Sequence, residues 1–163
     1  MAWLRRGQVE LGNRPAQTEP EDDDSPTALI RTTFAVNRVI NQNSGQLPGR
    51  AVVLARRLTD TLREIIDTAE VRPLDVYVVV SVKATLTDYL PTTLRSYLAV
   101  DPEARTRPAG PAGTPADLLM EQLDSLQSSA DAVLVATREH DVDALISQGK
   151  FLRTKFSGSD LDL

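Results

Sequence analysis

Few side chains in this sequence combine into a recognisable catalytic or metal-binding pattern. It contains no cysteine, which excludes thiolate chemistry and cysteine-ligated zinc, and its single histidine is His140. Catalysis by His140 would need a nucleophile or an orienting carboxylate placed beside it. Glu139, Asp141 and Asp143 are close in sequence, but their spacing is typical of a helix junction with a surface or capping histidine. We therefore expect no catalytic, cofactor-binding or metal-binding residues and no cofactor.

Two acidic groups have the chemistry to attract a divalent cation. They are residues 22–24, all aspartate, and the pair Asp141 and Asp143. Neither group has the alternating oxygen ligands and the glycine of a calcium loop, so solvated surface charge is the better interpretation.

The other chemically able side chains surround Pro91, in the run Tyr89-Leu90-Pro91-Thr92-Thr93-Leu94, with Tyr97 one turn later. Proline lacks an N–H and its ring crowds the carbonyl four residues back, so Pro91 should kink a helix or start a new one. Thr92 and Thr93 could present hydroxyls and N–H groups to an anion, or satisfy carbonyls that the proline leaves unpaired; we favour the second. The tyrosines should bridge core and solvent. These seven residues form the candidate functional motif.

Composition limits the fold and the classes of partner. The 163 residues suffice for one domain, and with 41% hydrophobic but only 4% aromatic residues, aliphatic side chains must fill its core. A net charge of −5, with basic residues interspersed among acids, argues against nucleic-acid binding. No run approaches the roughly eighteen apolar residues of a transmembrane helix. Together with the absence of cysteine, this predicts a cytoplasmic protein without a transmembrane segment.

Hydrophobic spacing predicts helices in the first half of the chain. Ser25 should cap a first helix with Pro26 at its first position, and the apolar pattern ends near residues 41–45. A second helix, the most clearly amphipathic, follows residues 48–49 and ends before residues 72–73.

Residues 75–82 are ambiguous, because they have the β-branched richness of a buried strand. No second strand candidate is available to pair with them, and a lone strand leaves its backbone groups unsatisfied. Val79, Val82, Leu86 and Leu90 also fit one helical face, so we expect a helix.

In the second half, residues 101–113 form a flexible Pro/Gly linker, and Thr114 with Pro115 should start the next helix. That helix carries one heptad-like apolar seam: Leu119, Leu123, Leu126, Ala130 and Val133. We expect the seam to be covered within the monomer; the alternative is a second copy or a partner. Asp141 should cap a last helix.

The predicted organisation is a disordered acidic tail over residues 1–25, a helical bundle domain over residues 26–156 and a C-terminal tail over residues 157–163. The fold class is all-α, an antiparallel bundle of four to five helices with disordered tails. Trp3 is the exception in the first tail: it packs on the domain, docks on a partner or lies in solvent.

Residues 89–94 resemble the central motif of the 5-bromo-4-chloroindolyl phosphate hydrolysis (XpaC-type) family. A tyrosine, a long helix and a short Asp-x-Asp helix follow the motif there, as Tyr97, the helix from residue 114 and Asp141-Val142-Asp143 do here. The resemblance implies a bacterial helical protein of the kind associated with stress response and toxic-anion (tellurite) resistance. It carries over no catalytic residue, because this chain shows no nucleophile–base pair.

We therefore expect a non-enzymatic helical protein that acts by protein–protein interaction, with a protein partner or as a homo-oligomer, in a bacterial stress or toxic-anion resistance assembly. One alternative is a metal-dependent phosphate-ester hydrolase. Another is a structural subunit of a larger assembly.

Overall fold

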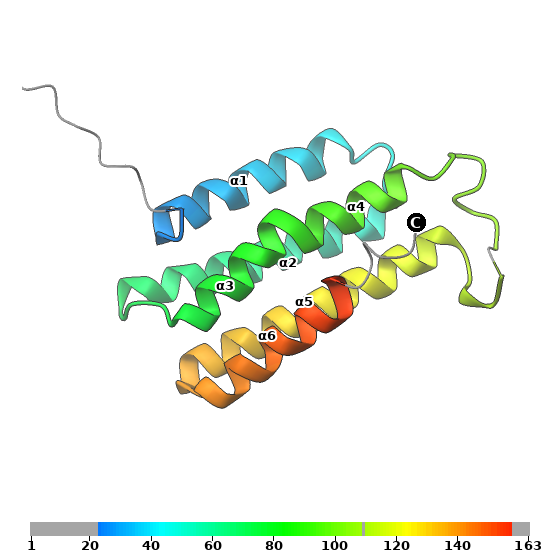
Figure 1. Ribbon diagram of the computed structural model, residues 1–163. Coiled ribbons are helices and arrows are strands. Elements are labelled where there is room, and N and C mark those ends of the chain that lie inside the picture. The colour runs from blue at the N-terminus through cyan, green and yellow to red at the C-terminus, as the bar shows by residue number, and fades with distance from the viewer. Residues whose placement is uncertain (1–22, 109, 158–163) are drawn as a thin grey trace, which may run out of the picture.

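A computed structural model describes residues 23–108 and 110–157, and in this part of the chain five helical rods pack against one another (Figure 1). The rods are α1 (Pro26–Gln42), α2 (Gly49–Asp67), a composite rod of α3 (Val76–Ala84), the π-helical η2 (Thr85–Tyr89) and α4 (Leu90–Leu98), then α5 (Pro115–Glu139) and α6 (Val142–Phe156). Two 3₁₀ turns, η1 (Thr68–Glu70) and η3 (Gly110–Ala112), lie in the connections. The described residues contain no strand. The predicted all-α bundle of four to five helices is confirmed, and so is the choice of a helix over a strand for residues 75–82, with Asp75 as the cap of α3.

Local capping residues set where several helices begin. The Ser25 hydroxyl accepts the Ala28 N–H at 3.2 Å, and Pro26 occupies the first turn of α1. At α5, the Thr114 hydroxyl accepts the Asp117 N–H while the Asp117 carboxylate accepts the Thr114 N–H at 2.9 Å. Such reciprocal bonds satisfy donors that the helix itself leaves unpaired. These predicted helix starts are therefore confirmed, as is the Asp141 cap of α6.

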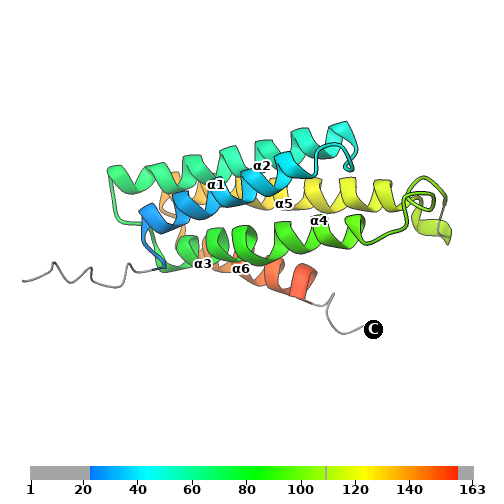
Figure 2. The same cartoon turned by 90° about the horizontal axis from the view of Figure 1, so that it is seen from above.

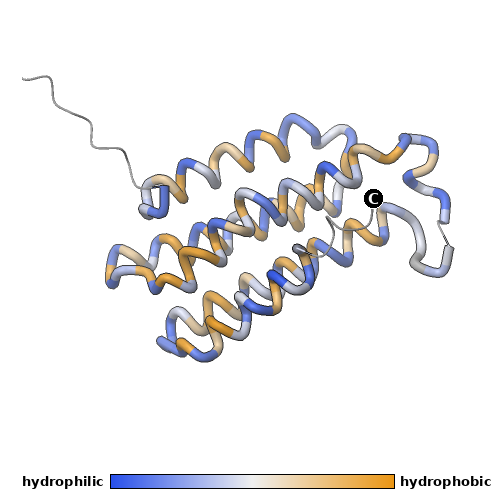
Figure 3. Tube along the Cα trace, in the orientation of Figure 1, coloured by the Kyte–Doolittle hydropathy of each residue, from blue (hydrophilic) through white to orange (hydrophobic). Residues whose placement is uncertain are grey.

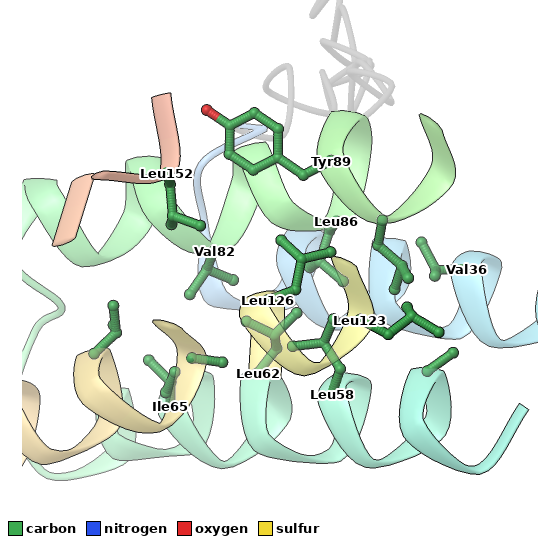
Figure 4. Packing of buried hydrophobic residues seen from close by; sticks show 14 of the residues in the cluster. Val36, Leu58, Leu62, Ile65, Val82, Leu86, Tyr89, Leu123, Leu126 and Leu152 are labelled. Carbon is green, nitrogen blue, oxygen red and sulfur yellow. The ribbon is translucent and has the colours of Figure 1, made fainter. Parts of the chain in front are cut away.

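The core forms where α2 meets α5, the most extensive helix pair, with α1 on α2 and α6 on α5 and α3 (Figure 2). Figure 4 shows aliphatic side chains of α2, the composite rod and α5 converging there, among them Leu58, Leu62, Ile65, Val82, Leu86, Leu123 and Leu126. The α5 seam of Leu119, Leu123, Leu126, Ala130 and Val133 is buried. Its predicted coverage within the monomer is confirmed.

Arg105 holds the connection between α4 and α5 against the bundle. Its guanidinium donates to the carbonyls of Leu98 at 2.9 Å, Val100 at 3.0 Å and Gln46 at 3.2 Å. It also lies 5.2 Å from the centre of the Tyr97 ring, within cation–π distance. Because Arg105 is buried, these bonds replace the water that its charge would otherwise need. The flexibility of residues 101–113 stays a prediction, but Arg105 gives this connection an anchor.

The predicted disordered tails lie outside the described residues, except for residues 23–25 and residue 157. Within the described residues, every helix is too short or too polar to span a bilayer.

Candidate functional site

The candidate motif lies where the composite rod passes from α3 through one π-helical turn into α4. The Leu90 N–H donates to the Thr85 carbonyl, five residues back instead of four. Pro91 follows at once and has no N–H to continue the α-helical pattern. Pro91 lies in the first turn of α4, so the predicted helix start is confirmed, and the predicted kink stays a prediction.

Most of the motif faces the core. Tyr89, Leu90, Thr93, Leu94 and Tyr97 are buried, while Pro91 and Thr92 are half-buried. The Tyr89 ring lies 5.4 Å from the Phe156 ring, and Figure 4 shows its hydroxyl pointing away from the cluster. The motif therefore joins the composite rod to α6, and most of its side chains are not available to a ligand.

The threonines that bind carbonyls at this break are not the two that the sequence singled out. Thr92 donates to the Asp88 carboxylate at 3.2 Å and accepts from Arg95 at 3.1 Å. The carbonyl-binding hydroxyls belong to Thr85, which donates to the Ser81 carbonyl, and Thr87, which donates to the Lys83 carbonyl, both at 2.8 Å. The available signal was their place inside a helix, because a helical threonine often donates to the carbonyl four residues back, as Thr33 does in α1.

A hollow of about 90 Å³ adjoins the motif, lined in part by Thr92, Thr93, Ser96 and Lys155. It is smaller than the about 300 Å³ at which ligand pockets for drug-sized molecules begin. The Lys155 ammonium donates to the Ser125 hydroxyl at 2.6 Å rather than pointing to an empty anion site. The motif is thus a packing element with a shallow polar edge.

His140 has the capping role that the sequence predicted. It is exposed, it adopts the left-handed conformation with φ 58°, and its N–H donates to the Ala136 carbonyl at the end of α5. The neighbouring Asp141 carboxylate accepts the Ala144 N–H at 2.9 Å. Among the described residues, no group of three or more histidine or acidic side chains is placed to hold a metal ion.

A pocket of about 470 Å³ lies at the end of the bundle where the α2–α3 connection meets the α5–α6 junction. It is called the main pocket below because of its apolar lining; the groove between α1 and α2 is larger, at about 640 Å³. Its apolar lining consists of Val71, Pro73, Leu74, Val78, Val142 and Leu145, and its polar lining of Thr68, Arg72, Asp75, Thr137, Arg138 and His140. Sequence reasoning missed this site, because its residues come from segments about seventy positions apart that only the fold brings together.

Several polar groups of the main pocket already have partners. The Asp75 carboxylate caps α3 by accepting the Tyr77 N–H at 2.8 Å, and Arg138 pairs with Glu64. The floor is apolar and tightly packed, since Val78 is 0% and Leu145 is 2% exposed, and the apolar lining that a bound side chain can reach includes Val142, which is 44% exposed. Val71 stands at the rim with 93% of its surface exposed. The site therefore offers an apolar hollow with an apolar rim, suited to binding an apolar side chain.

A second groove separates α1 from α2 and is more polar. Arg56 donates to the Asn41 side-chain oxygen at 2.7 Å, and Thr59 donates to the Asn37 side-chain oxygen at 2.8 Å. Arg63 lies 5.4 Å from the centre of the Phe34 ring and also pairs with Asp67, one turn later on α2, at 3.8 Å. Two hydrogen bonds and one cation–π contact across this groove tie α1 to α2, which gives its polar groups a structural role.

No family model, no curated protein and no solved structure matches the chain. The resemblance of residues 89–94 to the 5-bromo-4-chloroindolyl phosphate hydrolysis family stays a prediction. The geometry of the main pocket is the firmest basis for a functional argument.

Proposed function

We propose that this protein is a non-enzymatic helical module that binds another protein at the main pocket. The observation that carries the proposal is the continuity of the apolar floor with an apolar rim that stands in solvent. Exposed apolar surface grouped around a hollow is typical of protein interaction sites. An amphipathic helix of a partner would place one apolar side chain in the hollow and cover the rim with its neighbours.

The rim argues for a protein rather than a small molecule. A ligand confined to the hollow would leave Val71 in water, whereas a partner surface would cover it. Burying a fully exposed valine contributes about 1.5 kcal/mol, so coverage of the rim adds usefully to affinity. The bonds of Asp75 and Arg138 within the bundle also leave these groups less free for acid–base work. The cytoplasmic setting and the stress or toxic-anion resistance assembly belong to the same proposal, supported by the cysteine-free sequence and by residues 89–94.

Site-specific photo-crosslinking tests this proposal. A benzophenone amino acid replaces Val71 at the rim, and in a matched control it replaces Val53, an exposed valine on α2 outside the main pocket. We expect one defined protein adduct from native extract at position 71 and none at position 53. Val142→Asp, at the lining of the pocket, should abolish the adduct without loss of helicity. Equal labelling at both positions would contradict the proposal.

An activity assay addresses the enzymatic alternative directly. Purified protein is incubated with a phosphate monoester, with and without divalent metal ions, and the released phosphate is measured. We expect no turnover above the buffer rate. Turnover that depends on added metal would instead favour the hydrolase.

A further inference from the structure

The helix α3 is apolar on more sides than the bundle buries. Val78 and Val82 are completely covered, yet Val76 is 64%, Val80 59% and Tyr77 42% exposed. Figure 3 colours most of this helix toward the hydrophobic end. A helix that is apolar all round is expected to be buried all round, and valine is not itself a strong helix former. The three exposed residues, Val76, Tyr77 and Val80, are called the α3 stripe below.

The chain that leads into α1 is held next to one end of the α3 stripe. Lys83 lies one turn beyond Val80 on the same face, and its ammonium pairs with the Asp24 carboxylate at 2.6 Å. Figures 1 and 2 both show the start of α1 beside α3. The residues that precede position 23 therefore depart from a point next to the stripe.

Those preceding residues have the length and the composition to cover the stripe. Residues 2–11 include the apolar side chains Trp3, Leu4, Val9 and Leu11. From Val76 to Lys83 the helix rises only about 10 Å, whereas an extended chain spans about 3.3 Å per residue. Arg5 and Arg6 follow the first apolar pair, and Asp75 stands at the far end of the stripe with a complementary charge.

We propose that residues 2–11 dock on the α3 stripe of their own chain, with Trp3 as the main apolar anchor. Attachment through Asp24 gives the segment a high effective concentration at the stripe, which a second copy lacks in dilute solution. The docking face is different from the main pocket, whose floor includes Val78 on the buried side of α3. The proposal does not depend on the proposed function.

Trp3 is the only tryptophan in the sequence, so its fluorescence reports the docking directly in the full-length protein. We expect an emission maximum shifted to the blue and protection from acrylamide quenching, both unchanged on dilution. The double variant Val76→Asp and Val80→Asp should shift the emission to the red and abolish the protection. Val53→Asp, on α2, is the matched control and should leave both signals as in the unmodified protein. Because Val76 and Val80 are exposed, far-ultraviolet circular dichroism should show unchanged helicity in every variant.

Three results would overturn the proposal. The first is a Trp3 that emits and is quenched like a free tryptophan peptide in the unmodified protein. The second is protection that disappears on dilution, which would assign the stripe to a second copy. The third is protection abolished by Val71→Asp at the main pocket and retained in the α3 double variant, which would place the segment in that pocket. If the double variant loses helicity, the single variant Val80→Ser replaces it. Its Trp3 should then show a smaller red shift and a smaller loss of protection from acrylamide, again compared with Val53→Asp.

Discussion

The helices α3 and α5 both pack in the bundle, but their sequences distribute apolar side chains differently around the helix. α5 has 25 residues, a reciprocal cap and one apolar seam that the other helices cover. α3 has nine residues, apolar side chains on every face and an immediate transition into a π-helical turn. The sequence of α5 specifies which face is buried, whereas the sequence of α3 specifies only that burial is favourable. Surplus apolar surface therefore accumulates around α3, where both the main pocket and the α3 stripe lie.

The strongest test of this comparison is a charge in the α5 seam. Leu126 is 1% exposed, so Leu126→Asp buries a carboxylate without a partner and should unfold the domain, a loss of about 4 kcal/mol or more. Val135→Asp, at a 52% exposed position of the same helix, should change the free energy of unfolding by about 0.5 kcal/mol at most. Circular dichroism with urea titration measures both. A folded monomeric Leu126→Asp variant beside an oligomeric unmodified protein would show that the seam serves assembly instead.

Arg105→Ala should have the next largest effect, because it leaves the carbonyls of Leu98, Val100 and Gln46 without their shared donor. We expect a loss of about 2–3 kcal/mol in the free energy of unfolding. The control is Arg107→Ala, two residues later, since Arg107 is exposed and pairs only loosely with Glu103 at 3.7 Å; its loss should cost about 0.5 kcal/mol or less. Equal effects of the two changes would remove Arg105 as the anchor of this connection.

Pro91→Ala tests whether the π-helical turn is caused by the proline itself or by the packing of its neighbours in the core. Leu90 and Leu94 are buried in the core, and a shift of one residue in helical register would move both away from it. We therefore expect the π-helical turn to persist, with a loss of about 0.5–1 kcal/mol because the unfolded chain gains freedom. Backbone chemical shifts of residues 85–90 and a urea titration measure the two outcomes. A continuous α-helix in the variant would assign the turn to the proline alone.

The smallest expected effect concerns the α5 cap and depends on pH. Hydrogen bonds from the backbone N–H and the hydroxyl of Thr114 hold the pKa of Asp117 below its ordinary value of 3.8. A lowered folded-state pKa means that the ionised carboxylate stabilises the fold above the unfolded-state pKa, and this contribution disappears as the pH falls through the folded-state pKa. Asp117→Asn should therefore be slightly less stable than the unmodified protein at neutral pH and equal to it in strong acid. Glu121→Gln, an exposed change on the same helix, controls for loss of charge. Its difference in free energy of unfolding from the unmodified protein should be the same at neutral pH and in strong acid.

Sequence reasoning reached the features that depend on neighbours in the chain. Ser25, Thr114 with Asp117, and Asp141 fix helix starts through bonds to residues within three positions, so their pattern is visible in one dimension. The α5 seam was equally predictable, because helical periodicity alone places its members on one face. Pro91 marked the place of the irregular turn, but we expect the burial of Leu90 and Leu94 to maintain that turn.

Only the tertiary structure decided which apolar faces find partners and which polar groups meet. Val78 and Val80 have the same chemistry two residues apart, yet the position of α6 and α5 leaves one at 0% and the other at 59% exposure. In the sequence, Arg105 is one of several charged residues in a polar connection. Only the fold brings it to the Gln46 carbonyl, 59 positions away. Residue types and spacing fix local hydrogen bonding, but burial and long-range contact are properties of how the helices assemble.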